Sequence, residues 1–253
     1  ATIPHHLINI LEPDDDYSVS IFQQQAKSLI NQLNDNHVVP ILSGGTGLYV
    51  QSLLENYNFN DIKPNTKLRI ELDELYTEYG VDGLREYAQN LAEKGGIEIK
   101  YTDKHRLYRA IELMTAGDYE SLIKQTKEGL SYKGPVIGLQ RERSDLYDRI
   151  NRRVEIMFEK GLVDEVKQLL KNGVNPNCQA FKGIGYKEVV QYLEGLISYD
   201  ACVDLIQKNT RHFAKRQITW YKRMPYIEWI TIDSQTTEAE IYGMVCNIID
   251  SSF

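Results

Sequence analysis

The sequence has few cysteines, no long hydrophobic run and no basic leader. Its three cysteines, Cys178, Cys202 and Cys246, are odd in number and lack metal-ligand spacing, so we expect reduced thiols in a cytoplasmic protein. No apolar run approaches the roughly 20 residues that a membrane-spanning helix needs, and no membrane partner is expected. The opening residues ATIPHHLINILEPDDD are acidic where a signal peptide would be basic. Neither their two histidines nor their acidic run has convincing metal-site spacing.

Basic residues are scarce relative to acidic ones, yet they are concentrated in one place. The 253 residues are 42% hydrophobic and 26% charged, which is normal for a soluble globular protein, and the formal net charge is −7. Residues 204–225 hold six Lys or Arg and one Asp, a local charge of +5. An acidic protein with one basic face can bind a polyanion there and stay soluble elsewhere.

The first part of the chain alternates strand and helix patterns. We predict strands at 5–11 and 38–42, a helix from a Ser18 N-cap through Leu33, and another over 48–55. The strand–turn–helix order around Ser43–Gly47 indicates a βαβ unit and a parallel sheet.

The middle of the chain changes character. Residues 61–133 are charged, rich in tyrosine and helical in pattern, so we predict an all-helical insertion there. It interrupts an α/β core made of residues 1–60 and 134–253. The core resumes with a strand at 134–140, a helix from Ser144, a helix ending at Gly173 and a last strand in YIEWITID.

The turn SGGTG (43–47) is the first candidate site. Glycines before a helix let backbone N–H groups approach a phosphate or a base, and the helix N-terminus favours negative charge. No Gly-Lys-Ser/Thr follows, so the turn is not a Walker A loop. The alternative is a tight turn that needs a positive φ. Thr46 favours a site because its hydroxyl can point into a cleft.

Four basic segments are the other candidates. The helix start KHRLYRAIE (104–112) reads as an RNA contact or as an ordinary solvated face. The loop FKGIGYKE (181–188) fits a phosphodiester or simply leads into a helix. In RHFAKRQITWYKR (211–223), cations with aromatics fit phosphates and an unstacked base better than the alternative, a solvated basic helix with Phe213 and Trp220 as core anchors. Arg149 and Arg153, one turn apart, either converge on a pyrophosphate or pair with Asp145 or Glu155 on the surface.

These segments together resemble the tRNA dimethylallyltransferase (isopentenyl-tRNA transferase) family. The matching stretches include PHHLINILEPDDDYSVSIF, PILSGGTGLYVQSLL, HRLYRAIE, DLYDRINRRVEIMFEKGLVDEV, GIGYKEVVQYLEG and AKRQITWYKR. The resemblance implies a P-loop nucleotide-kinase-like α/β core with a parallel sheet, interrupted by an all-helical insertion that grips the anticodon stem. It implies transfer of a dimethylallyl group from dimethylallyl diphosphate to N6 of the adenine 3′ to the anticodon, which is flipped out of the loop.

The resemblance also implies roles for particular residues. Thr46 would position the substrate adenine, Arg149 and Arg153 would bind diphosphate, and Mg²⁺ would be the cofactor of a monomeric enzyme. The implied tRNA-binding residues are Arg69, His105, Arg106, Leu107, Tyr108, Arg109, Lys182, Gly183, Ile184, Gly185, Tyr186, Lys187, Lys215, Arg216, Gln217, Ile218, Thr219, Trp220, Tyr221 and Lys222.

The sequence departs from the family at its start. Members begin with a P-loop of Gly-x-Thr-x-x-Gly-Lys-Thr type and an Asp-Ser-x-Gln-x-Tyr motif that holds the general base, and neither stands here. We therefore expect a member that lacks its N-terminal segment in this sequence, is inactive without it, and has no metal ligand of its own. The alternatives are an adenylate isopentenyltransferase that uses free nucleotide and a non-catalytic RNA-binding module.

Overall fold

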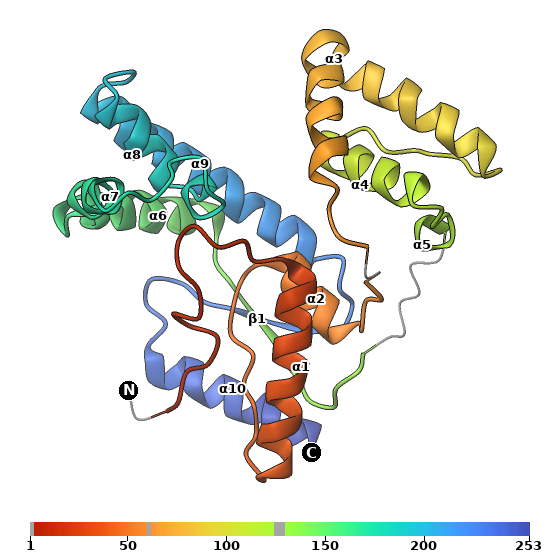
Figure 1. Ribbon diagram of the computed structural model, residues 1–253. Coiled ribbons are helices and arrows are strands. Elements are labelled where there is room, and N and C mark those ends of the chain that lie inside the picture. The colour runs from red at the N-terminus through yellow and green to blue at the C-terminus, as the bar shows by residue number, and fades with distance from the viewer. Residues whose placement is uncertain (1–2, 60–61, 124–129) are drawn as a thin grey trace. The chain divides into compact units, whose positions relative to one another are not determined.

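The chain divides into two compact units in a computed structural model that describes residues 3–59, 62–123 and 130–253 (Figure 1). The first unit is formed by residues 1–54 and 131–253, and the second by residues 55–130. None of the helices in these described ranges is both long and apolar enough to cross a membrane.

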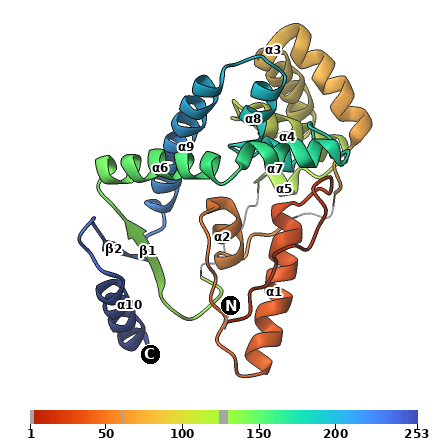
Figure 2. The ribbon, with the colours of Figure 1, turned by 90° about the vertical axis from the view of Figure 1, so that its left-hand side faces the viewer.

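The described part of the first unit contains helices and a two-stranded parallel sheet. Strand β1 pairs with β2 in a register that runs from Val136 opposite Ile227 to Gln140 opposite Thr231 (Figure 2). The elements of this unit are α1 (Val19–Asp35), α2 (Gly47–Leu54), β1 (Val136–Gln140), α6 (Arg143–Glu159), α7 (Leu162–Lys171), the 3-10 turn η1 (Ala180–Lys182), α8 (Tyr186–Leu193), α9 (Tyr199–Tyr221), β2 (Ile227–Thr231) and α10 (Glu238–Ser252).

The predicted strands at 5–11 and 38–42 are wrong, because the described backbone there is irregular. Leu7 and Asn9 have φ values of 59° and 54°, which no extended strand accommodates. In the second segment Val39 and Ile41 are 82% and 84% exposed. A β-branched run becomes a strand only when a neighbour takes up its backbone hydrogen bonds, and neither segment pairs with another in the described ranges.

Two helix-end predictions and two strand predictions are confirmed. Ser18 caps α1 by accepting a hydrogen bond from the backbone N–H of Ile21 at 3.2 Å. Helix α7 ends at Lys171, and Gly173 follows with a φ of 89°, the left-handed conformation that glycine adopts at low cost. The strands predicted in 134–140 and YIEWITID are β1 and β2.

The core of the first unit lies among α6, α7, α8 and α9. Apolar faces of these helices interlock, with α9 contacting both α6 and α8. The buried residues are Val154, Phe158, Leu162, Val166, Phe181, Val189, Cys202 and Ile206. This packing anchors the first half of α9, where Cys202 and Ile206 lie.

The described residues of the second unit form helices α3 (Thr66–Lys94), α4 (Lys104–Thr115) and α5 (Glu120–Ile123). Helix α3 changes direction at Gly80, whose φ of 66° and ψ of −155° are far from helical values. Leu68 and Leu72 before this kink and Leu84 and Ala88 after it bury a common apolar face with α4. Because of the kink, both halves of α3 pack against α4.

Candidate functional site

The glycine turn before α2 lies against the last turns of α9. The side-chain Nε2 of Gln217 donates a hydrogen bond to the carbonyl oxygen of Gly45 at 2.7 Å. Thr46 follows, exposed, and its carbonyl accepts the N–H of Val50 at 3.1 Å as α2 begins. The turn that presents Thr46 is therefore held by a residue of the basic helix.

Two glycines of the turn allow this close approach. A Cβ on Gly47 would lie 2.6 Å from Cδ1 of Trp220, and one on Gly45 would lie 2.4 Å from Nε2 of Gln217. Neither glycine has a positive φ. The alternative of a turn that needs positive φ is therefore wrong, and the glycines serve contact between the turn and α9.

Two polar side-chain groups in the last turn of α9 are buried. Among the described residues, neither Nε1 of Trp220 nor the hydroxyl of Tyr221 has a hydrogen-bond partner. Burial raises the pKa of Tyr221, so its hydroxyl stays protonated at neutral pH. Buried donors without partners are rare in folded proteins.

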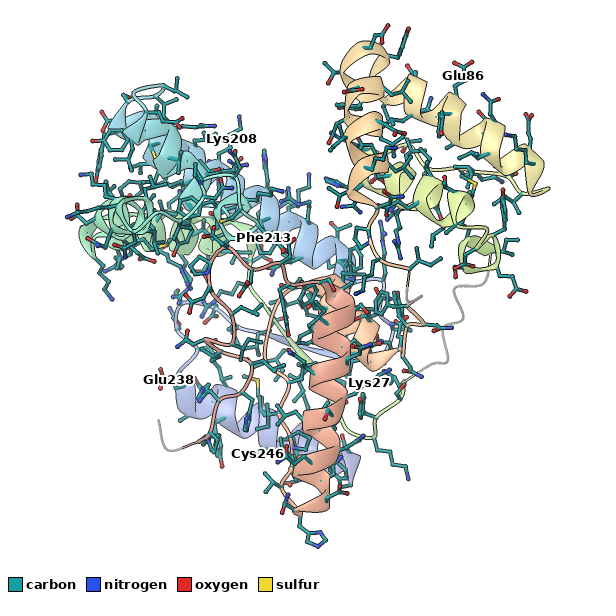
Figure 3. The ribbon with its side chains drawn as sticks, viewed as in Figure 1. Lys27, Glu86, Lys208, Phe213, Glu238 and Cys246 are labelled. Atoms are coloured by element: carbon teal, nitrogen blue, oxygen red, sulfur yellow. The ribbon has the colours of Figure 1, made fainter. Side chains whose placement is uncertain are left out.

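The same end of α9 presents exposed cations. Lys215, Arg216 and Lys222 are exposed, and within the described ranges none of the three forms an ion pair. Arg216 lies 5.9 Å from the ring centre of Phe213, which also projects from α9 (Figure 3). By contrast, Arg211 is used inside the unit, where its Nη1 donates to Oδ1 of Asn151 on α6 at 2.5 Å. Unpaired cations beside an aromatic ring suit an RNA backbone.

The loop Lys182–Lys187 is connected to α9 by a residue that the sequence did not single out. Glu188 is fully buried and accepts the N–H of Gly185 at 2.7 Å and Nδ2 of Asn209 on α9 at 2.8 Å. Gly185 has a φ of 107°, and Lys182 and Lys187 are exposed on either side of the turn. In the sequence, the available signal was the Glu188 carboxylate directly before the apolar pair Val189 and Val190.

Arg149 and Arg153 project from α6 into solvent. The alternative pairing of Arg149 with Asp145 is wrong, because Asp145 pairs with Arg141 through Nη1 at 2.7 Å. Both partners of that pair are largely buried. Arg149 is thereby left available for an anion.

The basic start of α4 in the second unit is partly core. Leu107 and Tyr108 are buried with exposures of 0% and 6%, whereas His105 and Arg106 are exposed. The hydroxyl of Tyr108 donates to Asp73 at 2.9 Å. The alternative of an ordinary solvated helix face is therefore wrong for the side chains of Leu107 and Tyr108, which are buried. Arg69 and Arg109 both contact Glu112.

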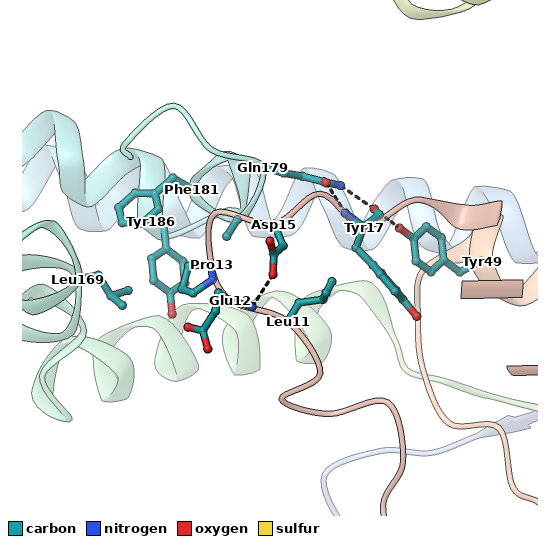
Figure 4. Close-up of a pocket in the computed structure, with 11 residues that line it drawn as sticks. Leu11, Glu12, Pro13, Asp15, Tyr17, Tyr49, Leu169, Gln179, Phe181 and Tyr186 are labelled. Carbon is teal, nitrogen blue, oxygen red and sulfur yellow. Dashed lines mark hydrogen bonds between the residues drawn. The ribbon is translucent and has the colours of Figure 1, made fainter. Parts of the chain in front are cut away.

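A cavity of about 510 Å³ lies in the first unit between the segment 11–17, Tyr49 and the α7–α8 region (Figure 4). Gln179 closes one side by bonding both N and O of Tyr17 at 2.9 Å. The charged residues of its wall are Glu12 and Asp15. Two carboxylates repel a phosphodiester or a diphosphate, so the cavity is not the anion site.

The described residues form no group of three or more His, Cys, Asp or Glu side chains that could hold a metal ion. No residue described here is assigned as a metal ligand. Mg²⁺ stays a prediction from the resemblance.

Comparison with known proteins finds one family over most of the chain. The family model described as IPP transferase matches residues 1–224. A tRNA dimethylallyltransferase of Alkaliphilus metalliredigens is 38% identical over 97% of this chain and 80% of its own length. That of Clostridioides difficile is 37% identical over 99% of this chain and 81% of its own length.

Two solved structures have similar folds. The full-length tRNA isopentenylpyrophosphate transferase of Bacillus halodurans gives a TM-score of 0.67 at 36% identity, over 99% of this chain and 80% of that one. The tRNA delta(2)-isopentenylpyrophosphate transferase of Staphylococcus epidermidis gives 0.68 at 33% identity, over 98% and 81%.

Proposed function

The chain belongs to the IPP transferase family, and we propose that it is a tRNA dimethylallyltransferase, a prenyltransferase that transfers a dimethylallyl group to tRNA. The observation that carries this proposal is the contact between the two most specific motifs. GGTGLY and KRQITW, far apart in sequence, meet through Gln217 and Gly45. A turn that presents a hydroxyl and a cationic helix that suits an RNA backbone thus form one site.

The donor in this proposal is dimethylallyl diphosphate, and the acceptor is N6 of the adenine 3′ to the anticodon. The N6 lone pair forms a bond to the allylic carbon, the carbon–oxygen bond to diphosphate breaks, and diphosphate leaves with the electron pair. N6 then loses one proton to a base, which the resemblance assigns to the Asp of a motif absent from residues 1–253. Thr46 orients the adenine, and the cations of α9 bind the anticodon stem-loop.

Arg149 and Arg153 are proposed to neutralise part of the charge on the departing diphosphate. They lie one helical turn apart and are exposed, so both guanidinium groups can reach one anion. Mg²⁺ would supply further positive charge to diphosphate. A monomeric, cytoplasmic enzyme remains our expectation.

The test supplies the complete natural protein with Mg²⁺, labelled dimethylallyl diphosphate and a tRNA transcript carrying adenine 3′ to the anticodon. Label should enter this tRNA and not a matched transcript with guanine at that position. Label entering AMP instead would establish the adenylate isopentenyltransferase alternative. Tight tRNA binding without transfer to either acceptor would establish the non-catalytic RNA-binding module.

A further inference from the structure

Glu112 is a buried carboxylate of the second unit that the candidate site described above does not use. Its side chain, on α4, is 1% exposed. Oε1 accepts the backbone N–H of Asn65 at 3.0 Å and Nε of Arg69 at 2.7 Å. Oε2 accepts Nη2 of Arg69 and Nη1 of Arg109, both at 3.2 Å. A carboxylate buried this far is tolerated only because cations and hydrogen bonds compensate it.

The two guanidinium groups come from different helices. Arg69 lies in the first turn of α3 and Arg109 in α4, and their side chains are 43% and 34% exposed. Arg109 also donates Nη2 to the carbonyl of Ile62 at 2.8 Å, which fixes the plane of its fork. The two guanidinium groups are thus partly exposed and are held in fixed orientations around the same carboxylate. Planar cations fixed in this way suit a phosphodiester, whose oxygens accept N–H bonds.

We propose that Glu112 is a positioning residue that holds Arg69 and Arg109 as a two-guanidinium clamp for a phosphate of the bound tRNA. The inference rests on the proposed function, since it names the part of the helical unit that receives the RNA backbone. Glu112 itself does not touch the RNA. It converts two flexible cations into a fixed pair, so less conformational entropy is lost when RNA binds.

Simple electrostatics makes the opposite prediction. Glu112 is negative, and removing a negative charge near a polyanion strengthens attraction through the general field. If Glu112 acts by geometry, its replacement weakens binding although the local charge becomes more positive. The sign of the change therefore separates positioning from charge.

The variant that exploits this difference is Glu112→Gln. Its carbonyl oxygen keeps the place of Oε1, so Asn65 and Nε of Arg69 retain a partner and the fold is preserved. Its amide NH₂ group replaces Oε2 and faces the N–H donors of both arginines. The variant therefore loses the hydrogen bond from Nη2 of Arg69 and the hydrogen bond from Nη1 of Arg109. We expect binding of an unmodified tRNA transcript to weaken about tenfold and the log K against log salt slope to shrink by about 0.7 to 0.9.

Two further measurements, made with the complete natural protein, tie the effect to arginine geometry. In an Arg109→Met background, Glu112→Gln should weaken binding less than in wild type, because one of its targets is gone. Arg109→Lys, which keeps the charge and loses the fork, should also weaken binding. Ala88→Gly, in the distal half of α3, controls for a merely less stable unit and should bind as wild type does.

Unchanged or tighter binding by Glu112→Gln, or wild-type binding by Arg109→Lys, would overturn the positioning role. An equal loss of binding on Glu112→Gln in the wild-type and Arg109→Met backgrounds would also overturn it. If wild-type protein itself shows no preference for tRNA over a DNA duplex of equal length, the proposed function fails instead. The two failures are thus distinguished by the wild-type measurement.

Discussion

Gln217 on α9 donates a 2.7 Å hydrogen bond to the backbone carbonyl of Gly45, which lies 172 residues earlier. The indole of Trp220, one turn later, packs where a Cβ on Gly47 would stand. Thr46 lies between these two contacts. A shift of α9 would therefore move the turn that carries Thr46.

The three glycines of the turn should respond differently to alanine. Gly47→Ala should destabilise the first unit by roughly 1–3 kcal/mol, because the new Cβ meets a rigid indole at 2.6 Å. Gly45→Ala meets only the end of the flexible Gln217 side chain, so it should cost less stability but break the hydrogen bond. Gly44→Ala has open space around it and is the matched control. Urea denaturation measures all three, and equal midpoints for Gly44→Ala and Gly47→Ala would contradict the packing role.

Thr46→Ala should slow transfer more than it lowers stability. The hydroxyl is exposed and its backbone, not its side chain, makes the hydrogen bond that starts α2. Losing one hydrogen bond to substrate costs on the order of 1 kcal/mol, a several-fold loss in kcat/KM. Thr46→Ser keeps the hydroxyl and should restore most of the rate. Normal turnover with a large fall in Tm would instead make Thr46 a structural residue.

Lys215→Ala and Lys222→Ala should each weaken tRNA binding with little dependence on sequence. Each lost phosphate contact should reduce the magnitude of the log K against log salt slope by about 0.7 to 0.9. Lys171→Ala, an exposed cation at the end of α7, is the charge-matched control and should leave the slope unchanged. Slopes equal to wild type in both α9 variants would remove this helix from the interface.

The second unit should lose stability in acid. Burial raises the pKa of Glu112, but the hydrogen bonds from Arg69, Asn65 and Arg109 outweigh it, and the net pKa is lowered from 4.5. A depressed folded-state pKa gives stability that is complete above the unfolded value and is lost as pH falls through the folded value. Unfolding followed by circular dichroism should therefore show an acid-dependent loss beginning below about pH 4.5, reduced in Glu112→Gln. An identical loss in that variant would assign the effect to other carboxylates.

Cys202 should resist alkylation in the native protein. Burial, with the nearby Glu188 carboxylate, raises the pKa of its thiol to about 11, so the reactive thiolate is scarce at pH 8. Cys178 and Cys246 are partly exposed and are not buried in the same way. Iodoacetamide treatment followed by peptide mass spectrometry should label these two first. Labelling of Cys202 at the same rate would show that the α8–α9 packing opens readily.

The sequence alone identified features that depend on residues a few positions apart in the chain. Ser18 caps α1 because a hydroxyl at that position reaches the N–H of Ile21, and Gly173 ends α7 because glycine adopts positive φ readily. The same reasoning failed for 5–11, where β-type composition was outweighed by the left-handed backbone of Leu7 and Asn9. A strand requires a partner that no local pattern supplies.

The candidate site divides in the same way between sequence and tertiary structure. The sequence determined which segments are candidates for the site, because the spacing of glycines, cations and aromatic residues is a property of the sequence. Only the tertiary structure showed that Gln217 bonds to Gly45. It also showed that Glu188 links Gly185 to Asn209. The ion pairs of Glu112 with Arg69 and Arg109 are likewise tertiary contacts. Residue type and helical spacing are set along the chain. Which distant side chains meet is set by how apolar faces pack, and that packing is a property of the whole fold.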